Sequence, residues 1–129
     1  MLTKDFINPS SMGFSNAVSY MSNGVKTIVV AGQVGHDGKE APEDIGAQAE
    51  IAFANVAGQL EAAGASVDDV IKLNVYIVNL NRESSTAVGI AKAKFFIGEN
   101  QPASTWVGVV ALIFPGLLVE IEATAVVEA

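Results

Sequence analysis

Glu120 and Glu122 are the acidic residues whose spacing could support chemistry, because they lie two positions apart in the C-terminal segment LLVEIEATAV. On a β-strand alternate side chains share a face, so the two carboxylates would project together, roughly 6–7 Å apart. We expect Trp106 on the same surface. A carboxylate beside an indole at a closed interface is partly desolvated, and it can act as a general base or hold a water molecule. The alternative is that both carboxylates are hydrated or hydrogen-bonded to a neighbouring subunit.

The residue inventory excludes several other kinds of catalytic centre. The chain has no cysteine and one histidine, so thiol catalysis and a multi-histidine metal site are excluded. His36 lies in the turn sequence VGHDGK, where a histidine is more often exposed than catalytic. Gly32, Gly35 and Gly38 lack the GxGxxG spacing that cradles phosphate between a strand and a helix. We therefore expect no metal and no other cofactor.

Composition and charge limit the class of protein. The 129 residues are enough for one domain, 1–129, with a buried core. Hydrophobic residues make up 50% and charged residues 16%, which indicates an apolar surface or a large interface. The net charge of −7, with 7 scattered basic residues, argues against a nucleic-acid partner. No apolar stretch reaches the roughly 20 residues of a membrane span, and the N-terminus lacks a signal-peptide core. We expect a cytoplasmic protein without a membrane partner.

Turn signals and hydrophobic periodicity divide the chain into strands and two helices. Asn23-Gly24 is a strong hairpin signal, Gly64 suits a helix C-terminus, and Asn81 suits a helix N-terminus. Turn residues fill 35–42. The expected elements, in chain order, are strands at 17–23 and 26–34, a helix at 43–63, a strand at 70–79, a helix at 81–97, and strands at 104–112 and 117–127, the last two around Pro115-Gly116.

This order, ββαβαββ with about six strands, predicts an α+β fold whose two helices cover one face of a sheet. In the strand 70–79 the expected inward residues are Ile71, Leu73, Val75 and Ile77. The uncovered face would carry Tyr76, Trp106, Val110 and Val126 beside Lys72, Glu120 and Glu122. That mixture is too apolar to remain in water and too polar for a monomer core. It predicts a closed, symmetric subunit interface.

Four segments resemble the RidA/YjgF family. SMGFSNAV is similar to the family's GPYSQAV, and IVVAGQVG is similar to its strand that ends in SGQ. AAGASVDDVIKLNVYIVNLN resembles the family stretch AAG…DIVKTTVFVKDLN, and PASTWVGVVALIFPGLLVEIEATAV resembles the C-terminal signature. The resemblance implies a chorismate-mutase-like fold with a six-stranded mixed sheet, assembled as a homotrimer with a central barrel and three clefts between subunits.

The resemblance also implies where a ligand would bind. In family deaminases an arginine clamps the carboxylate of a 2-imino acid, and a glutamate orients the attacking water. The glutamate matches Glu120, which the resemblance therefore makes the catalytic residue, whereas the arginine position is Ser104. The positions implied to contact a small-molecule substrate are Phe14, Ala31, Gly32, Gln33, Ser104, Thr105 and Trp106.

Several of these positions depart from the family pattern. Phe14 replaces a tyrosine, Ala31 a serine, Trp106 a small residue, and Gly89 an asparagine. A guanidinium holds a carboxylate through two charge-assisted hydrogen bonds of about 1.5–3 kcal/mol each, so its loss at Ser104 costs roughly 10² to 10⁴ in affinity. A ligand of this cleft is expected to be flatter, less anionic or held by stacking.

Three functions are consistent with the sequence. The first is a divergent hydrolase or deaminase that acts on an enamine, imine or related metabolite, with Glu120 positioning water. The second is a catalytically silent trimer that binds or senses a small molecule in the same cleft. The third is the endoribonuclease or translation-inhibitor role of some relatives, against which the acidic charge and the missing arginine argue.

Overall fold

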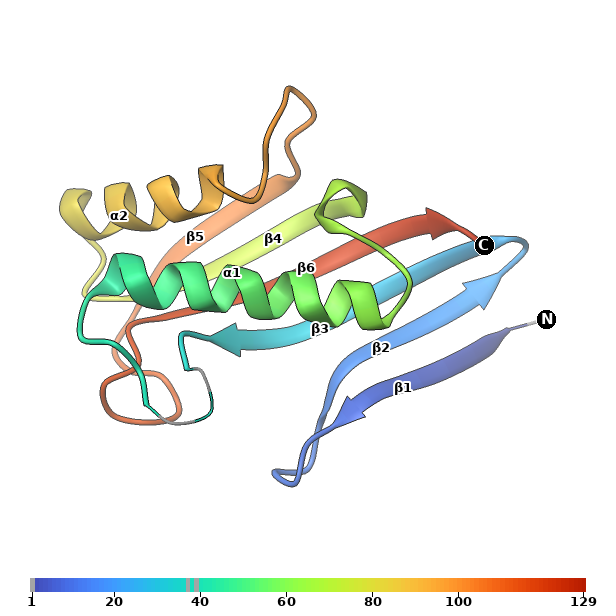
Figure 1. Cartoon of the computed structure of the whole chain (residues 1–129), viewed down its shortest axis with the longest axis horizontal. Helices are drawn as coiled ribbons and strands as arrows, with labels where there is room; N and C mark the ends of the chain where they lie inside the picture. The colour runs from blue at the N-terminus through green and yellow to red at the C-terminus, as the bar shows by residue number, and fades with distance from the viewer. Residues whose placement is uncertain (1, 37, 39) are drawn as a thin grey trace.

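The computed structural model describes residues 2–36, 38 and 40–129. Six strands form a mixed sheet in the order β1-β2-β3-β6-β4-β5, in which β4 and β5 are parallel and the other neighbours antiparallel. Helices α1 and α2 lie side by side over one face of this sheet (Figure 1). The α+β class, the mixed sheet and the two helices on one face are therefore confirmed. The bounds are β1 Thr3–Pro9, β2 Ser15–Ser22, β3 Val25–Val34, α1 Ile45–Ala62, a 3₁₀ turn Val67–Asp69, β4 Val70–Val78, α2 Arg82–Ala93, β5 Ala103–Val109 and β6 Val119–Glu128.

β1 is the strand that the predicted order ββαβαββ does not contain. Its sequence, TKDFINP, shows no apolar alternation, and six of its seven residues are exposed, so the hydrophobic pattern carries no signal there. The strand forms by antiparallel pairing with β2, and Ile7 packs against the core. Its contribution to the sheet is therefore mainly backbone hydrogen bonding at an edge.

The predicted hairpin and the start of the first helix are confirmed. Asn23 and Gly24 have φ of 54° and 80°, the positive values that a tight two-residue hairpin turn requires. Asp44 caps α1, and its carboxylate accepts a hydrogen bond from the Ala47 backbone N–H at 2.9 Å. In the predicted turn 35–42, residues 37 and 39 lie outside the described residues.

The second helix begins as predicted and ends earlier. The Asn81 side chain accepts a hydrogen bond from the Ser84 backbone N–H at 2.8 Å, but α2 ends at Ala93 instead of continuing to residue 97. Beyond the helix, both Phe95 and Phe96 contact the Phe53 ring, with centroids 5.8 and 5.9 Å apart. Consecutive helical residues point about 100° apart, so a regular helix favours contact of only one of the two rings with Phe53.

The core lies between the helices and the covered face of the sheet, with one change from the predicted strand pattern. Leu73, Val75 and Ile77 are buried, as expected. Ile71 is instead 53% exposed, because a register shift next to it in the pairing with β6 places Val70 in the core. The expectation for Ile71 was wrong because alternation cannot reveal a bulge.

β5 faces the opposite way from the prediction. Parallel pairing sets Trp106 beside Val75 and Ser104 beside Leu73, two residues that are buried under the helices. Trp106 is half-buried and packs against the core. The prediction that Trp106 shares the uncovered face with Glu120 is therefore wrong, since a one-residue difference in strand register exchanges the two faces.

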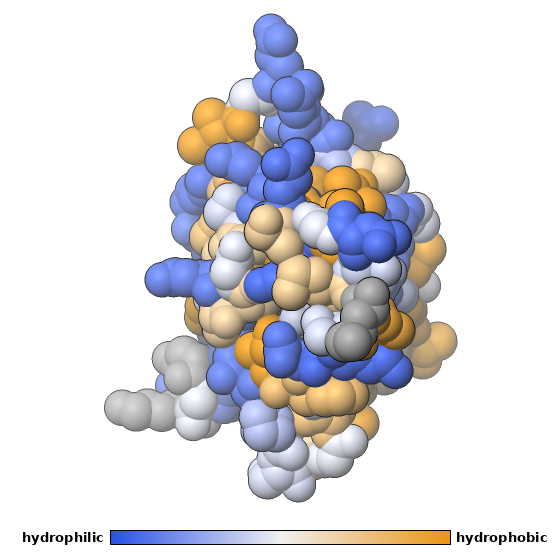
Figure 2. All heavy atoms as spheres, turned by 90° about the vertical axis from the view of Figure 1, so that its right-hand side faces the viewer, coloured by the Kyte–Doolittle hydropathy of each residue, from blue (hydrophilic) through white to orange (hydrophobic). Residues whose placement is uncertain are grey.

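The surface of the molecule carries both hydrophobic and hydrophilic side chains. Figure 2 shows hydrophobic areas between hydrophilic side chains at the end where the β2–β3 turn and the C-terminus lie. Exposed apolar residues on the strands include Phe6, Val25 and Val29. Within the described residues, no helix has the length and apolar character needed to cross a membrane.

Helix α1 positions two loops and the end of β3. Gln48 is fully buried; its amide N–H groups donate to the carbonyls of Pro42 at 2.7 Å and Gly116 at 2.8 Å, and its carbonyl accepts from the Leu118 backbone N–H at 2.8 Å. Gly35 lies so close that an added Cβ would overlap the Gln48 backbone. The segment that leads into β6 is therefore held against α1.

Candidate functional site

Two adjoining hollows lie where β3 ends and β6 begins. One has a volume of about 410 Å³ and the other about 800 Å³, both within the usual range for small-molecule sites. Their linings share Met12, Phe14, Gly32, Val34 and Phe114. Because they share these lining residues, the two hollows adjoin, and we describe them together as one cleft. We call it the Glu120 cleft, after the carboxylate at one end.

The Glu120 cleft brings together five of the eight predicted site residues. Phe14 and Gly32 line both hollows, Ala31 and Glu120 line the smaller, and Gln33 lines the larger. Gln33 is buried. Its amide donates one hydrogen bond to the Asn16 side-chain oxygen at 3.1 Å and another to the Ala31 backbone carbonyl at 3.0 Å. These bonds fix the amide in the wall.

A close contact between two strands places the Glu120 carboxylate. The register between β3 and β6 shifts between Val30 and Gln33, so that Gly32 lies in an irregular segment opposite the Glu120 side chain. A Cβ added at Gly32 would overlap the Glu120 carboxylate and its adjoining carbons. Glycine is therefore required for this carboxylate to lie flat against β3.

The two neighbouring carboxylates have different environments. Glu122 Oε1 accepts hydrogen bonds from Tyr76 Oη at 2.7 Å and Asn74 Nδ2 at 3.0 Å. Burial, and secondly the Glu122 charge, raise the pKa of Glu120 above its ordinary value of 4.5. The hydrogen bond to Glu122 is the largest cause of a raised Tyr76 pKa, followed by burial and the charges of both glutamates. Glu122 is thus a hydrogen-bonded carboxylate, whereas Glu120 is a half-buried carboxylate whose pKa is raised.

Ser104, Thr105 and Trp106 lie away from the Glu120 cleft of the same chain. They belong to β5, which is separated from β6 by β4, a lateral distance of roughly 9–10 Å. Trp106 Nε1 donates to Ser104 Oγ at 2.6 Å on the helix-covered face. Thr105 is on the other face, where its hydroxyl accepts from Lys72 Nζ at 2.7 Å. One copy therefore does not unite these three residues with Glu120.

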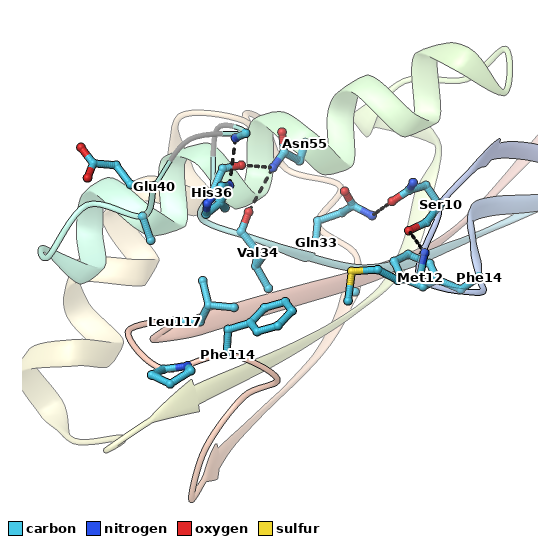
Figure 3. Close-up of a pocket in the computed structure, with 15 residues that line it drawn as sticks. Ser10, Met12, Phe14, Gln33, Val34, His36, Glu40, Asn55, Phe114 and Leu117 are labelled. Carbon is cyan, nitrogen blue, oxygen red and sulfur yellow. Dashed lines mark hydrogen bonds between the residues drawn. The ribbon is translucent and has the colours of Figure 1, made fainter.

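Four residues that line the smaller hollow were missed by sequence reasoning. Met12 lies in the β1–β2 loop, Val34 at the end of β3, and Ile113 and Phe114 in the loop between β5 and β6. Figure 3 shows the Phe114 ring projecting from its loop toward Val34 and Met12. The available signal is the run VVALIFPG, whose first four residues fall in the predicted strand 104–112. The structure ends β5 at residue 109 and starts β6 at residue 119, leaving this run in a loop.

His36 is closer to the cleft than the prediction of an exposed turn residue implied. It is half-buried and lines the larger hollow, and its Nδ1 accepts a hydrogen bond from the Gly38 backbone N–H at 2.9 Å. Asn55 of α1 donates to the carbonyls of Val34 at 3.0 Å and His36 at 3.4 Å. The Gly38 N–H orients the imidazole, and Asn55 holds the backbone at Val34 and His36. Among the described residues, no three His, Asp or Glu side chains are grouped to bind a metal.

The geometry defines an α+β protein with an apolar cleft that contains one half-buried carboxylate. The family model described as Endoribonuclease L-PSP matches residues 8–127 of the chain. A 2-iminobutanoate/2-iminopropanoate deaminase from Escherichia coli strain K12 is 36% identical over 103 residues, which cover 77% of this chain and 78% of the deaminase.

Solved structures agree with this match. A Mycobacterium tuberculosis member of the YjgF/YER057c/UK114 family has 33% identity and a TM-score of 0.79, with 97% of this chain and 100% of that chain covered. A Pseudomonas aeruginosa protein of unknown function has 34% identity and a TM-score of 0.81, covering 97% and 93%. The chain belongs to the endoribonuclease L-PSP family, and the resemblance to RidA/YjgF proteins is confirmed.

Proposed function

We propose that this protein hydrolyses reactive imines or enamines of small metabolites, with Glu120 as the catalytic residue that positions and deprotonates water. The observation that supports this most directly is the placement of Glu120 in the 410 Å³ hollow, where burial raises its pKa. A carboxylate whose pKa is raised is a stronger base than an ordinary exposed one. The similarity to a protein named 2-iminobutanoate/2-iminopropanoate deaminase supports the same reaction class.

The proposed reaction needs only water. Glu120 accepts a proton while the water oxygen bonds to the imine carbon, and the C=N electron pair moves to the nitrogen, which takes up a proton from solvent. In the carbinolamine that results, the C–N bond breaks with both electrons leaving on nitrogen. The Glu120 proton completes ammonia, and the hydroxyl proton is lost as the carbonyl forms. One imine and one water give one carbonyl compound and one ammonia, without an oxidant or reductant.

The complete site in this proposal lies between copies of the chain in a homotrimer. One copy supplies Glu120 with Phe14, Ala31, Gly32 and Gln33. A neighbouring copy supplies Ser104, Thr105 and Trp106, because β5 of the same copy is two strands away from Glu120. The exposed apolar residues of the sheet support burial against another copy.

In this proposal, Ser104 makes the site less suited to negatively charged substrates. A serine hydroxyl carries no charge, and this one already accepts a hydrogen bond from Trp106 Nε1. We therefore expect weaker binding of 2-imino carboxylates than an arginine at this position would give, by roughly 10² to 10⁴. Uncharged imines avoid this loss.

The test compares Glu120→Gln with wild type. Imines are generated in situ from amines by an amine oxidase and from amino acids by an amino-acid oxidase, and their decay is followed above the uncatalysed rate. General-base removal is expected to lower the catalysed rate by about 10² or more. Glu128→Gln, which alters an exposed carboxylate at the end of the same strand, is the matched control and should retain the wild-type rate. Background rates with wild type for every imine would refute hydrolysis.

A silent binding protein is the second candidate. The observation that favours it is the Ser104–Trp106 hydrogen bond, because it occupies the hydroxyl in the position where an anion clamp is expected. This candidate predicts ligand binding that Glu120→Gln leaves within about twofold, together with no catalysed imine decay.

A further inference from the structure

The mouth of the Glu120 cleft is bordered by apolar side chains from two loops that are far apart in sequence. Met12 and Phe14 come from the β1–β2 loop, and Ile113 and Phe114 from the β5–β6 loop. Their exposed fractions are 59%, 45%, 69% and 52%. Large apolar groups on loop tips gain little from folding, so four of them around one hollow indicate a surface that binds apolar material.

Both loops are held in place by hydrogen bonds of their own. In the first loop, Ser10 Oγ accepts from the Met12 N–H at 3.0 Å, and the Ser10 N–H donates to the Phe14 carbonyl at 2.7 Å. In the second, the buried Gln48 amide binds Gly116 and Leu118, both at 2.8 Å. The apolar border is therefore preorganised, which lowers the ordering cost of binding.

The apolar border and Glu120 line the same hollow. Its volume of about 410 Å³ exceeds the roughly 150 Å³ of an apolar cavity that holds benzene. A ring or branched alkyl group can thus occupy the border while the carbon attached to it reaches the carboxylate.

We propose that Met12, Phe14, Ile113 and Phe114 form an apolar subsite that binds an aromatic or branched aliphatic substituent on the substrate's reacting carbon. This inference rests on the proposed function, because it assigns the substrate class of the same cleft. Among imines that carry the same carboxylate, those with phenylalanine-like and leucine-like skeletons are preferred, and the imine of alanine is a poor substrate. One additional buried methylene in an apolar pocket changes specificity by about tenfold or more, so a phenyl or isobutyl group should exceed a methyl group by at least that factor.

The experiment uses imines made in situ from alanine, leucine and phenylalanine by one amino-acid oxidase. These imines share the same carboxylate and nitrogen and differ only in the side chain. Wild type is expected to give kcat/KM values for the leucine and phenylalanine imines at least about tenfold above that for the alanine imine. Phe114→Ala and Met12→Ala should each reduce that ratio severalfold. Val110→Ala is the matched control, since Val110 is apolar and 98% exposed on the same loop but outside the cleft lining; its ratio should equal that of wild type.

Failure of this inference is distinguishable from failure of the proposed function. Hydrolysis with equal or higher kcat/KM for the alanine imine would overturn the subsite while leaving hydrolysis established. If no imine is hydrolysed, binding of the stable oxo acids with the same skeletons decides the question. Phenylpyruvate should then bind at least about tenfold more tightly than pyruvate by calorimetry, with the difference reduced in Phe114→Ala. Equal affinities would overturn the subsite in that case as well.

Discussion

Gln48→Met replaces a buried amide with an apolar side chain of similar length and similar helix propensity. The substitution removes three hydrogen bonds, those to the carbonyls of Pro42 and Gly116 and from the N–H of Leu118. Methionine fills most of the space and keeps α1 intact, so the change isolates the loss of polar contacts. It tests whether the loop before β6 depends on this one side chain.

The magnitude follows from the burial of the groups left behind. The net contribution of one hydrogen bond to folding stability is about 1 kcal/mol, and a buried polar group that is left without a partner costs about 1–3 kcal/mol. Three such bonds at a fully buried residue give an expected loss of roughly 3–5 kcal/mol in the free energy of unfolding. Because typical domains have about 5–15 kcal/mol of stability, this is a large fraction of the total.

The assay is urea unfolding at a fixed protomer concentration, since assembly would make stability depend on concentration. Gln59→Met, in the same helix, is the matched control, because Gln59 accepts one exposed hydrogen bond, from Asn8 at 2.8 Å. That variant should lose less than about 1 kcal/mol. Hydrogen exchange should also show reduced protection of the Leu118 N–H in Gln48→Met. A Gln48→Met loss within 1 kcal/mol of the Gln59→Met loss would refute the reasoning.

Three further outcomes are expected. Light scattering should give three times the mass of one chain, and a stable monomer would contradict the trimer proposal. Glu120→Gln should be more stable than wild type at neutral pH and equal to it well below pH 4.5. The reason is that the folded-state pKa of Glu120 is raised above 4.5, so wild type loses stability as the pH rises from 4.5 through that raised pKa. Urea unfolding at several pH values measures the difference in stability, and a difference that does not change with pH would contradict this prediction. Gly32→Ala should reduce imine hydrolysis by about tenfold or more, because the added Cβ displaces the Glu120 carboxylate. Gly58→Ala, where a Cβ on α1 meets open space, should leave the rate unchanged and raise the free energy of unfolding by up to about 1 kcal/mol. Equal rates for the two alanine variants would argue against the contact between Gly32 and Glu120.

The elements with strong local signals were predictable from sequence. Asn23-Gly24 and Asn81 have side chains and backbone preferences that act within a few residues, and both begin or join elements as expected. β1 was not predictable in this way, because its residues are mostly exposed and its strand character comes from pairing with β2.

The placement of the candidate site residues was predictable within family motifs, but not where it depends on how the strands pair. Ala31, Gly32 and Gln33 stand in a motif, and the structure places them around the cleft with Glu120. The face of the sheet on which Trp106 lies depends on the register between β5 and β4, and the sequence of β5 by itself does not determine that register. Ile113 and Phe114 were not predicted to line the cleft, because an apolar run with a proline can be either a strand end or a loop.

The positions of Ser104 and Trp106, on the face of the sheet opposite Glu120 and two strands away, have a genetic consequence for the proposed assembly. A copy altered at Glu120 and a copy altered at Trp106 would each be inactive alone, yet they carry their defects in different halves of every site. Random mixing of the two would pair two intact halves at about one interface in four. Co-expression of two defective alleles would therefore restore a fraction of the activity, whereas two alleles that both lack Glu120 would restore none.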